Sequence, residues 1–293
     1  MTMSKKVLIV GGVAGGATAA ARLRRLDENA EIIMFEKGNY ISYANCGLPY
    51  YIGGEIKEKS ALTLQTPKSF NNRFNVDVRI LSEVIAIDPK AKSVTVTNHA
   101  TGESYSEGYD KLILSMGAEP FRPGIEGIDS DKVFTLRTIP DTFKIKEYID
   151  DNKPGRAAIV GGGFIGVEMA ENLKNAGLSV TIIEMLDQVI APIDYDMACD
   201  VHRHLESKGV RLMLGNGLRS ISDNGSSLKI TLDNDEIDTD MLIMAIGVRP
   251  DTGIARDAGI LLNKRGSIVV DNHMLTSEKD IYAVGMPLKS LIL

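Results

Sequence analysis

Cysteine and histidine are scarce in this sequence, and their positions exclude two kinds of site. Cys46 and Cys199 are the only cysteines and lie far apart, so the chain offers no disulfide framework. This usage is typical of a reducing compartment and predicts a cytoplasmic protein. Of the four histidines, His202 and His204 lie two residues apart on a predicted helix and therefore point to different sides. We accordingly predict no metal site.

The sequence also lacks a concentrated basic run and an apolar segment of membrane length. The net charge is −6, and the most basic stretch is Arg22-Leu23-Arg24-Arg25 on a predicted helix. Nucleic-acid binding generally requires a concentrated basic face, so nucleic acid is not an expected partner. The apolar run Val7–Val10 ends in glycine and is too short for a signal peptide or a membrane span. We expect no membrane partner.

Length and composition predict a folded protein of two domains. The chain has 293 residues, more than a single hydrophobic core usually supports. Its 44% hydrophobic and 25% charged residues are ordinary for a globular protein, so extensive disorder is not expected.

A glycine-rich turn between a strand and a helix occurs twice. Val7–Val10 predicts a buried strand, Gly11 to Gly16 form the turn, and Ala17–Leu26 predicts a helix. The pattern returns with strand Ala157–Val160, the turn Gly161-Gly162-Gly163-Phe164-Ile165-Gly166, and helix Val167–Asn175. In the first turn, Val13 occupies the position of the middle glycine.

An acidic residue follows each glycine turn at a distance that suits a nucleotide ribose. Glu36 ends the next strand, 36 − 16 = 20 residues after Gly16, and Glu184 lies 184 − 166 = 18 residues after Gly166. An acid at this point can accept hydrogen bonds from ribose hydroxyls, while the turn and the helix N-terminus bind pyrophosphate. One glycine match is weak. Two matches, each in its expected context, predict an α/β fold with two dinucleotide-binding units.

The order of the remaining segments predicts that the second unit is inserted in the first. Val76–Ile87 and Ser93–Thr97 predict strands between the units. After Ser115-Met116-Gly117-Ala118, a stretch with prolines reads as a crossing between domains, and the segment from Gly247 to Asp251 resembles it and returns the chain. We therefore expect a first domain of residues 1–120 and 248–293, and a second of residues 121–247.

The segment from Ile41 to Tyr51 carries the candidate redox residue, Cys46. Its neighbours are small or polar, and Pro49 can open a helix just after the thiol. A thiol at a helix N-terminus is more readily the reactive thiolate. The alternative is that Cys46 is a buried structural residue, as most cysteines are, and we interpret Cys199 in that way.

On these residues, the chain resembles the pyridine nucleotide-disulfide oxidoreductases over about Lys6 to Gly285. Within that family it resembles the group with one redox cysteine, which comprises coenzyme A-disulfide reductases, NADH oxidases and NADH peroxidases. The resemblance implies two Rossmann-like domains, with FAD in the first and NADH or NADPH in the second. It assigns FAD to Gly11, Gly12, Gly16, Glu36 and Lys37, with the crossing motif at Ser115 and Gly117 beside the flavin. The nicotinamide nucleotide is assigned to Gly161, Gly163, Gly166 and Glu184, with Glu168 as a further candidate. Gly247, in the second crossing, is also a cofactor-binding candidate. For Glu168, favourable placement near a helix start explains its presence equally well.

The segment Ser42–Tyr50 is most similar to coenzyme A-disulfide reductases. That similarity implies a small disulfide such as coenzyme A disulfide, or a persulfide, as substrate. It places Ser42, Asn45 and Cys46 at the substrate, with Thr18, Arg22 and Arg25 facing coenzyme A. In the implied relay, hydride passes from NAD(P)H to flavin, and electrons then reach Cys46. Glu184 favours NADH, because its carboxylate repels a 2′-phosphate. An NADH oxidase or peroxidase is the alternative.

The C-terminal end differs from the family pattern. Relatives continue the last strand as Gly-Asp, whereas Met286 follows Gly285 here. We therefore expect a C-terminally truncated form of the family pattern, without its dimerisation domain. Relatives are homodimers, so we expect dimerisation to be impaired and exposed apolar surface to favour self-association. An inactive nucleotide-binding fragment is therefore a further alternative.

Overall fold

The computed structural model describes residues 4–285 and 288–290, and divides them into two compact units. The first unit comprises residues up to Tyr43, Thr63–Glu119 and the segment from Arg249 onward. The second comprises Ala44–Leu62 and Pro120–Val248. The position of the expected acid, Met286, lies outside the described residues.

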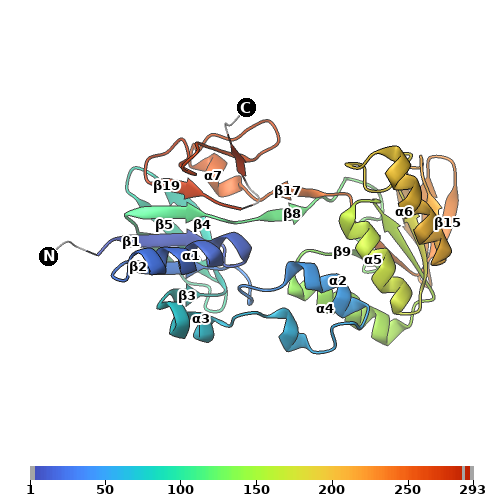
Figure 1. Ribbon diagram of the computed structural model, residues 1–293, viewed down its shortest axis with the longest axis horizontal. Coiled ribbons are helices and arrows are strands. Elements are labelled where there is room, and N and C mark those ends of the chain that lie inside the picture. The colour runs from blue at the N-terminus through green and yellow to red at the C-terminus, as the bar shows by residue number, and fades with distance from the viewer. Residues whose placement is uncertain (1–3, 286–287, 291–293) are drawn as a thin grey trace. The chain divides into compact units, whose positions relative to one another are not determined.

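A five-stranded parallel sheet forms the centre of the first unit (Figure 1). Its strands alternate between two apolar faces, since Leu8 and Val10 of β1 contact one cluster of core residues and Val7 and Ile9 contact another. This double burial explains the continuous apolar runs in the sequence. In sheet order the strands are β19 (Ile281–Ala283), β7 (Lys111–Leu114), β1 (Lys6–Val10), β2 (Glu31–Phe35) and β3 (Asp77–Arg79).

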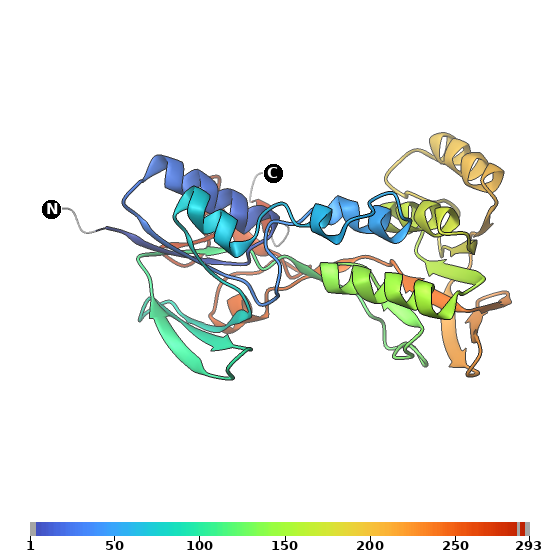
Figure 2. The same ribbon diagram turned by 90° about the horizontal axis from the view of Figure 1, so that it is seen from below.

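Different layers cover the two faces of this sheet (Figure 2). Helices α1 (Ala14–Leu26) and α3 (Pro67–Phe74) bury Ala17, Ala20 and Phe70 on one face. The antiparallel strands β4 (Ser82–Asp88), β5 (Ser93–Asn98) and β6 (Ser104–Gly108) and helix α7 (Gly253–Asp257) cover the other. The remaining pair of the unit is β18 (Ile268–Val270) with β20 (Leu288–Ser290).

The second unit repeats the arrangement of the first. Its five parallel strands follow an equivalent order, β9 (Val133–Thr135), β16 (Met241–Met244), β10 (Arg156–Val160), β11 (Ser179–Ile183) and β12 (Val210–Met213). The helices of this unit are α2 (Leu48–Ile52), α4 (Ile139–Asn152), α5 (Phe164–Asn175) and α6 (Tyr195–Ser207), with the short 3₁₀ helices η1 (Asn45–Gly47) and η2 (Lys59–Leu62). An antiparallel meander packs on one face, formed by β13 (Leu218–Asp223), β14 (Leu228–Leu232) and β15 (Glu236–Thr239).

The expected α/β fold with a second unit inserted in the first is confirmed, and the crossing segments pair with each other as β8 (Ala118–Pro120) and β17 (Val248–Pro250). The expected boundaries at residues 120 and 248 lie beside the observed divisions. However, residues 44–62 group with the second unit and not with the first. The cause is packing, because Tyr51 and Ile52 of α2 are buried and α2 contacts α4 and α5.

Local signals explain two further differences from the expected elements. The run 76–87 is two strands in different sheets, because the backbone turns at Leu81, whose φ is +51°. Helices α3 and α4 were not predicted, although each has a proline in its first turn and a capping box, begun by Thr66 and Thr138 respectively. Over the described part of the chain, no helix combines the length and apolarity that crossing a membrane requires.

Candidate functional site

The glycine turn of the first unit brings the backbone of three segments together. Gly11 has φ +98°, and a Cβ there would lie 2.2 Å from the carbonyl oxygen of Ser115. A Cβ at Gly16 would lie 1.8 Å from the carbonyl oxygen of Gly11. Both positions therefore require glycine, and the result is a close turn at the start of α1. The free N–H groups of that helix start can bind an anionic phosphate.

The second unit has the same turn with a more open front. Gly161 has φ +107° and lies against Ala245, and a Cβ at Gly166 would be 1.9 Å from the Gly161 oxygen. A Cβ at Gly163 would meet no atom within 4 Å, so space is open beside the start of α5. In the first unit Val13 precedes α1 at the equivalent position. A phosphate group can thus approach the second turn more closely.

Each predicted ribose acceptor is fixed by its own glycine turn. Glu36 accepts hydrogen bonds from the N–H groups of Gly12 at 2.8 Å and Gly38 at 2.9 Å. Glu184 accepts from Gly162 at 2.6 Å and Leu186 at 2.9 Å. A carboxylate has about four lone-pair sites, so each acid keeps capacity for ribose hydroxyls.

A backbone feature of the loop after each acid is also repeated. Ser42 has φ +45° and donates its N–H to the oxygen of Gly12 at 3.0 Å. Ile190 has φ +49° and donates its N–H to the oxygen of Gly162 at 2.8 Å. Such a backbone is unusual for non-glycine residues, above all for β-branched isoleucine. Ser42 therefore has a structural role beside its predicted contact with substrate.

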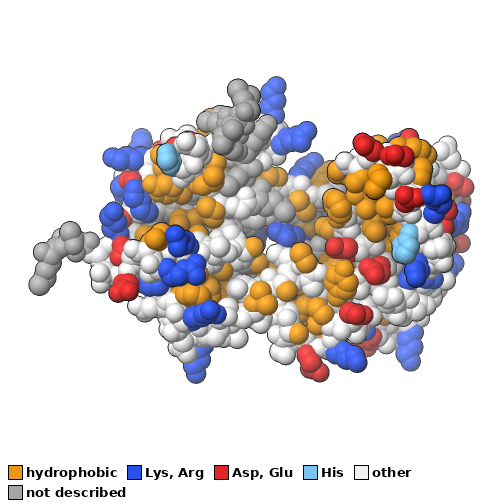
Figure 3. All heavy atoms as spheres, in the orientation of Figure 1, with side chains coloured by type: hydrophobic (Ala, Val, Ile, Leu, Met, Phe, Trp, Pro, Cys, Tyr) orange, Lys and Arg blue, Asp and Glu red, His pale blue; other side chains and the backbone are white. Residues whose placement is uncertain are grey.

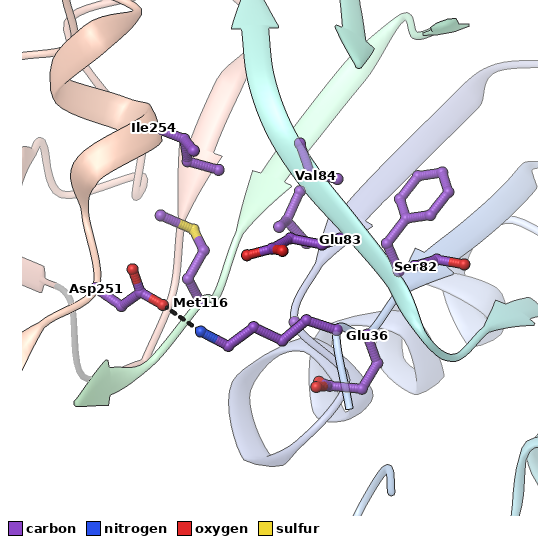
Figure 4. Close-up of a pocket in the computed structure, with 11 residues that line it drawn as sticks. Glu36, Ser82, Glu83, Val84, Met116, Asp251 and Ile254 are labelled. Atoms are coloured by element: carbon purple, nitrogen blue, oxygen red, sulfur yellow. Dashed lines mark hydrogen bonds and ion pairs between the residues drawn. The ribbon is translucent and has the colours of Figure 1, made fainter. Parts of the chain in front are cut away.

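A pocket lies behind the first glycine turn, with Glu36 at its edge (Figure 4). Val84, Met116 and Ile254 supply apolar walls, while the ammonium of Lys37 donates to Asp251 at 2.9 Å and to Glu119 at 3.3 Å. Burial opposes the charge of Lys37, but these carboxylates outweigh burial and raise its pKa. An apolar slot beside a ribose acceptor and a glycine turn fits the adenosine end of FAD. The sequence-based analysis named Met116 only as part of the crossing motif and missed Val84 and Ile254, because these residues come from separate segments of the chain.

The other predicted cofactor residues, Ser115, Gly117 and Gly247, lie at the crossings. Ser115 donates its N–H to the backbone oxygen of Val10 at 2.8 Å. Gly117 has φ +81°, and its backbone oxygen accepts a hydrogen bond from the N–H of Asp251 at 3.1 Å. In the second unit, Gly247 has φ +105°, and its backbone oxygen accepts a hydrogen bond from the N–H of Phe121 at 2.9 Å. These bonds fix where each crossing strand begins.

Cys46 is exposed and lies within η1, directly before α2. Pro49 stands in the first turn of α2, so the predicted helix after the thiol is confirmed. The N–H of Ala44 donates a hydrogen bond to the backbone oxygen of Leu62 at 2.9 Å, which joins the two ends of the segment 44–62. The structural alternative for Cys46 required a buried side chain. Exposure instead leaves the thiol open to a reaction partner.

A groove of about 530 Å³ in the first unit contains three of the predicted substrate residues, Thr18, Arg25 and Ser42. Arg22 is exposed on α1, the helix that also carries Thr18 and Arg25, but it does not line the groove. Asn45 lies in the second unit. The groove adds a cation that the sequence-based analysis missed, Arg73, because α3 was not predicted. Figure 3 shows lysine and arginine side chains over α1 and α3. The other lining residues are small, apolar or uncharged polar: Val13, Ala14, Ala17, Ala21, Tyr43, Leu64, Gln65, Phe70 and Phe74.

Two further side chains of the second unit, Glu168 and His202, have interactions that bear on the nucleotide turn. Glu168 is half-buried on α5, and its burial, together with the nearby Glu171 carboxylate, raises the pKa of Glu168. His202 accepts a hydrogen bond at Nε2 from the N–H of Val189, at 3.1 Å. Among residues 4–285, no group of three or more acidic, histidine or cysteine side chains is arranged to hold a metal ion.

The family model for "Pyridine nucleotide-disulphide oxidoreductase" matches residues 5–286. The chain is 37% identical to a coenzyme A disulfide reductase of Staphylococcus haemolyticus and 38% identical to an NADH oxidase of Methanocaldococcus jannaschii, each over 96% of this chain and 62% of the relative. The crystal structure of reduced Bacillus anthracis CoADR-RHD matches with a TM-score of 0.95 and 51% identity, over 97% of this chain and 51% of that one.

The chain thus spans between half and two thirds of the length of these relatives. The family match nevertheless covers both glycine turns, both acids and Cys46. On the sequence and the fold together, the chain belongs to the pyridine nucleotide-disulphide oxidoreductase family.

Proposed function

We propose that this chain is the nucleotide-binding and thiol-bearing part of an FAD-dependent NAD(P)H:disulfide oxidoreductase. The observation that carries the proposal is an exposed thiol at Cys46, just before a helix, in a chain whose two compact units each contain a glycine turn and an acid fixed by that turn. The substrate we propose is coenzyme A disulfide. A relative that is 37% identical is named for its reduction, which supports this choice.

The residues and the space at each glycine turn support the assignment of one nucleotide to each unit. The pocket beside Glu36 supports FAD in the first unit, with Gly11, Gly12 and Gly16 at the pyrophosphate. The open space at Gly163 and the fixed carboxylate of Glu184 support NADH in the second. A bound flavin supplies two-electron transfer between a nicotinamide and sulfur.

The protein's own chemical step takes place at the sulfur atom of Cys46. Its thiolate attacks one sulfur of coenzyme A disulfide, forming a Cys46–coenzyme A disulfide bond and releasing one coenzyme A thiolate. Two electrons and one proton, derived from NADH, then cleave the new bond. This step returns the Cys46 thiolate and releases the second coenzyme A as a thiol.

The groove between α1 and α3 supports an anionic substrate with an apolar portion. Arg25 and Arg73 can pair with phosphate groups, and the partly buried Phe74 offers apolar surface. An NADH oxidase is the second candidate, because one relative carries that name at 38% identity. Reduction of dioxygen requires no cationic groove, so the groove favours the disulfide.

The proposal is tested by trapping the mixed disulfide. The purified chain is incubated with coenzyme A disulfide without reductant, digested and analysed by mass spectrometry. We expect coenzyme A on Cys46, no adduct in Cys46→Ser, and an unchanged adduct in Cys199→Ser. Labelling of Cys199 instead, or of neither cysteine, contradicts the proposed role. Adduct formation with no removal by NADH in the presence of added FAD would show that the chain does not complete the relay.

The place of action belongs to the same proposal. Both cysteines are free, and the thiolate of Cys46 must remain reduced between turnovers. A reducing cytoplasm meets that requirement.

A further inference from the structure

An amide buried in the second unit has an unpaired oxygen. The side chain of Asn172 on α5 has no exposed surface, and its Nδ2 donates to the backbone oxygen of Glu168 at 2.8 Å. Its Oδ1 is buried without a hydrogen-bond partner. Buried polar atoms are rarely left in this state, so the position calls for an explanation.

The atoms that face this oxygen belong to Gly53, at the C-terminal end of α2. A Cβ at Gly53 would lie 2.4 Å from Oδ1 of Asn172, and 3.0 Å from its Cβ and Cγ. The backbone of Gly53 has φ −71°, which any residue can adopt. Glycine is thus required here by the close approach of α5, and not by the conformation of the turn.

Aromatic and apolar contacts hold the rest of the same segment. The ring of Tyr51 meets the ring of Phe143 edge-on, with centroids 5.7 Å apart, and the ammonium of Lys59 lies 4.7 Å from the Phe143 centroid. Ile52 is fully buried. The Gly53–Asn172 contact sets how closely α2 approaches α5, while the ring contact between Tyr51 and Phe143 holds α2 against α4. Since Cys46 directly precedes α2, this seating determines where the thiol is presented.

We propose that Gly53 and Asn172 are positioning residues for Cys46, acting through the distance between α2 and α5. This inference rests on the proposed function only in giving Cys46 a redox role. The contact explains the unpaired oxygen of Asn172, because a closely seated glycine leaves no space for a hydrogen-bonding group.

A double-substitution cycle tests the pair in a Cys199→Ser background, in which Cys46 is the sole thiol. Gly53→Ala should displace α2, and with it the thiol that precedes this helix, and should slow the reaction of Cys46 with an aromatic disulfide reagent about threefold at neutral pH. The dissociation constant for NADH should stay within about twofold, since neither residue belongs to the nucleotide turn. In Gly53→Ala/Asn172→Ala, the smaller side chain makes room for the new methyl group and should restore the rate.

The neighbouring glycine provides a matched control. Gly54 has φ +83° and open space around it, so Gly54→Asn, which tolerates this backbone, should leave the thiol rate unchanged. An unaltered rate in Gly53→Ala, or a loss that Asn172→Ala does not restore, would overturn the proposal. If Gly53→Ala alone does not fold, recovery of folded, reactive protein by the second substitution supports it, and failure to recover contradicts it. If Cys46→Ser still reduces the disulfide, the proposed function is refuted. The reaction rate of Cys46 with the aromatic disulfide reagent would still test whether Gly53 and Asn172 position Cys46.

Discussion

The N–H of Val189 donates to Nε2 of His202, and the next residue, Ile190, donates to the backbone oxygen of Gly162. Gly162 in turn donates to the carboxylate of Glu184. The loop after β11 is therefore tied to α6 and to the glycine turn, and the acid expected at the ribose is held between them. The imidazole must present an unprotonated Nε2 to accept this bond.

Removal of the acceptor at position 202 should weaken NADH binding. For His202→Leu we expect a loss of about 1 kcal/mol, equivalent to a roughly fivefold higher dissociation constant, because one hydrogen bond that fixes the loop is lost. His202→Gln keeps an acceptor and should bind nearly as well as the wild type. His204→Leu, an exposed site on the same helix, is the control. Calorimetric titration with NADH measures all three, and equal affinities would refute the role of this contact.

The charge of Glu184 should decide between NADH and NADPH. Glu184→Gln removes the negative charge that repels a 2′-phosphate, and it exchanges one acceptor oxygen for a donor group that opposes the N–H of Gly162. We expect the ratio of the NADPH to the NADH dissociation constant to fall about tenfold, which corresponds to roughly 1.4 kcal/mol. Titration with both nucleotides gives the ratio directly. A preference that stays constant would place cofactor selection elsewhere.

An ion-pair cluster predicts how stability depends on acidity. Hydrogen bonds from Lys111 and Lys92 lower the pKa of Asp280 to about 2. A carboxyl with a lowered folded-state pKa stabilises the fold above its unfolded value of about 3.9, and this stability is lost as pH falls toward the folded value. Asp280→Asn should therefore unfold at lower urea concentration at pH 7, and its difference from wild type should shrink between about pH 4 and pH 2.

Asp257 offers a control for that measurement. It pairs with Arg256 on an exposed surface, where such pairs contribute little. Asp257→Asn should match the wild type in urea at every pH. A difference between Asp280→Asn and wild type that persists at the lowest pH would show that lost packing, and not charge, causes the effect.

Arg73 should contribute to binding of the anionic disulfide. Arg73→Gln removes one cation of the groove between α1 and α3, and we expect a severalfold higher KM for coenzyme A disulfide with a weaker dependence on salt. Arg22→Gln is the matched comparison, because Arg22 is exposed on α1 but does not line the groove. A larger effect at Arg22 than at Arg73 would favour the assignment made from sequence resemblance over the one made from the groove.

Features set by neighbouring residues could be predicted from the sequence. The runs ending at Val10 and Val160 were identified as strands because a buried parallel strand is apolar on both faces. The acids Glu36 and Glu184 were found by spacing alone, and each lies at the end of its strand. The helix after Cys46 was indicated by Pro49.

Features set by packing between distant segments could not be predicted in this way. Residues 44–62 group with the second unit because Ile52 is buried where α2 packs on α4 and α5, helices that lie about a hundred residues further along the chain. Asp251 reaches Lys37 across 214 positions. The capping box at Thr66 was a readable signal for α3, but only the fold shows that α3 brings Arg73 to the groove.

The most direct test of the central claim is NADH-dependent release of coenzyme A thiol from coenzyme A disulfide, measured anaerobically with added FAD. Wild type and Cys199→Ser should release two thiols for each NADH oxidised, and Cys46→Ser should release none while still binding NADH. Thiol release that survives in Cys46→Ser would contradict the assignment of Cys46 as the redox thiol.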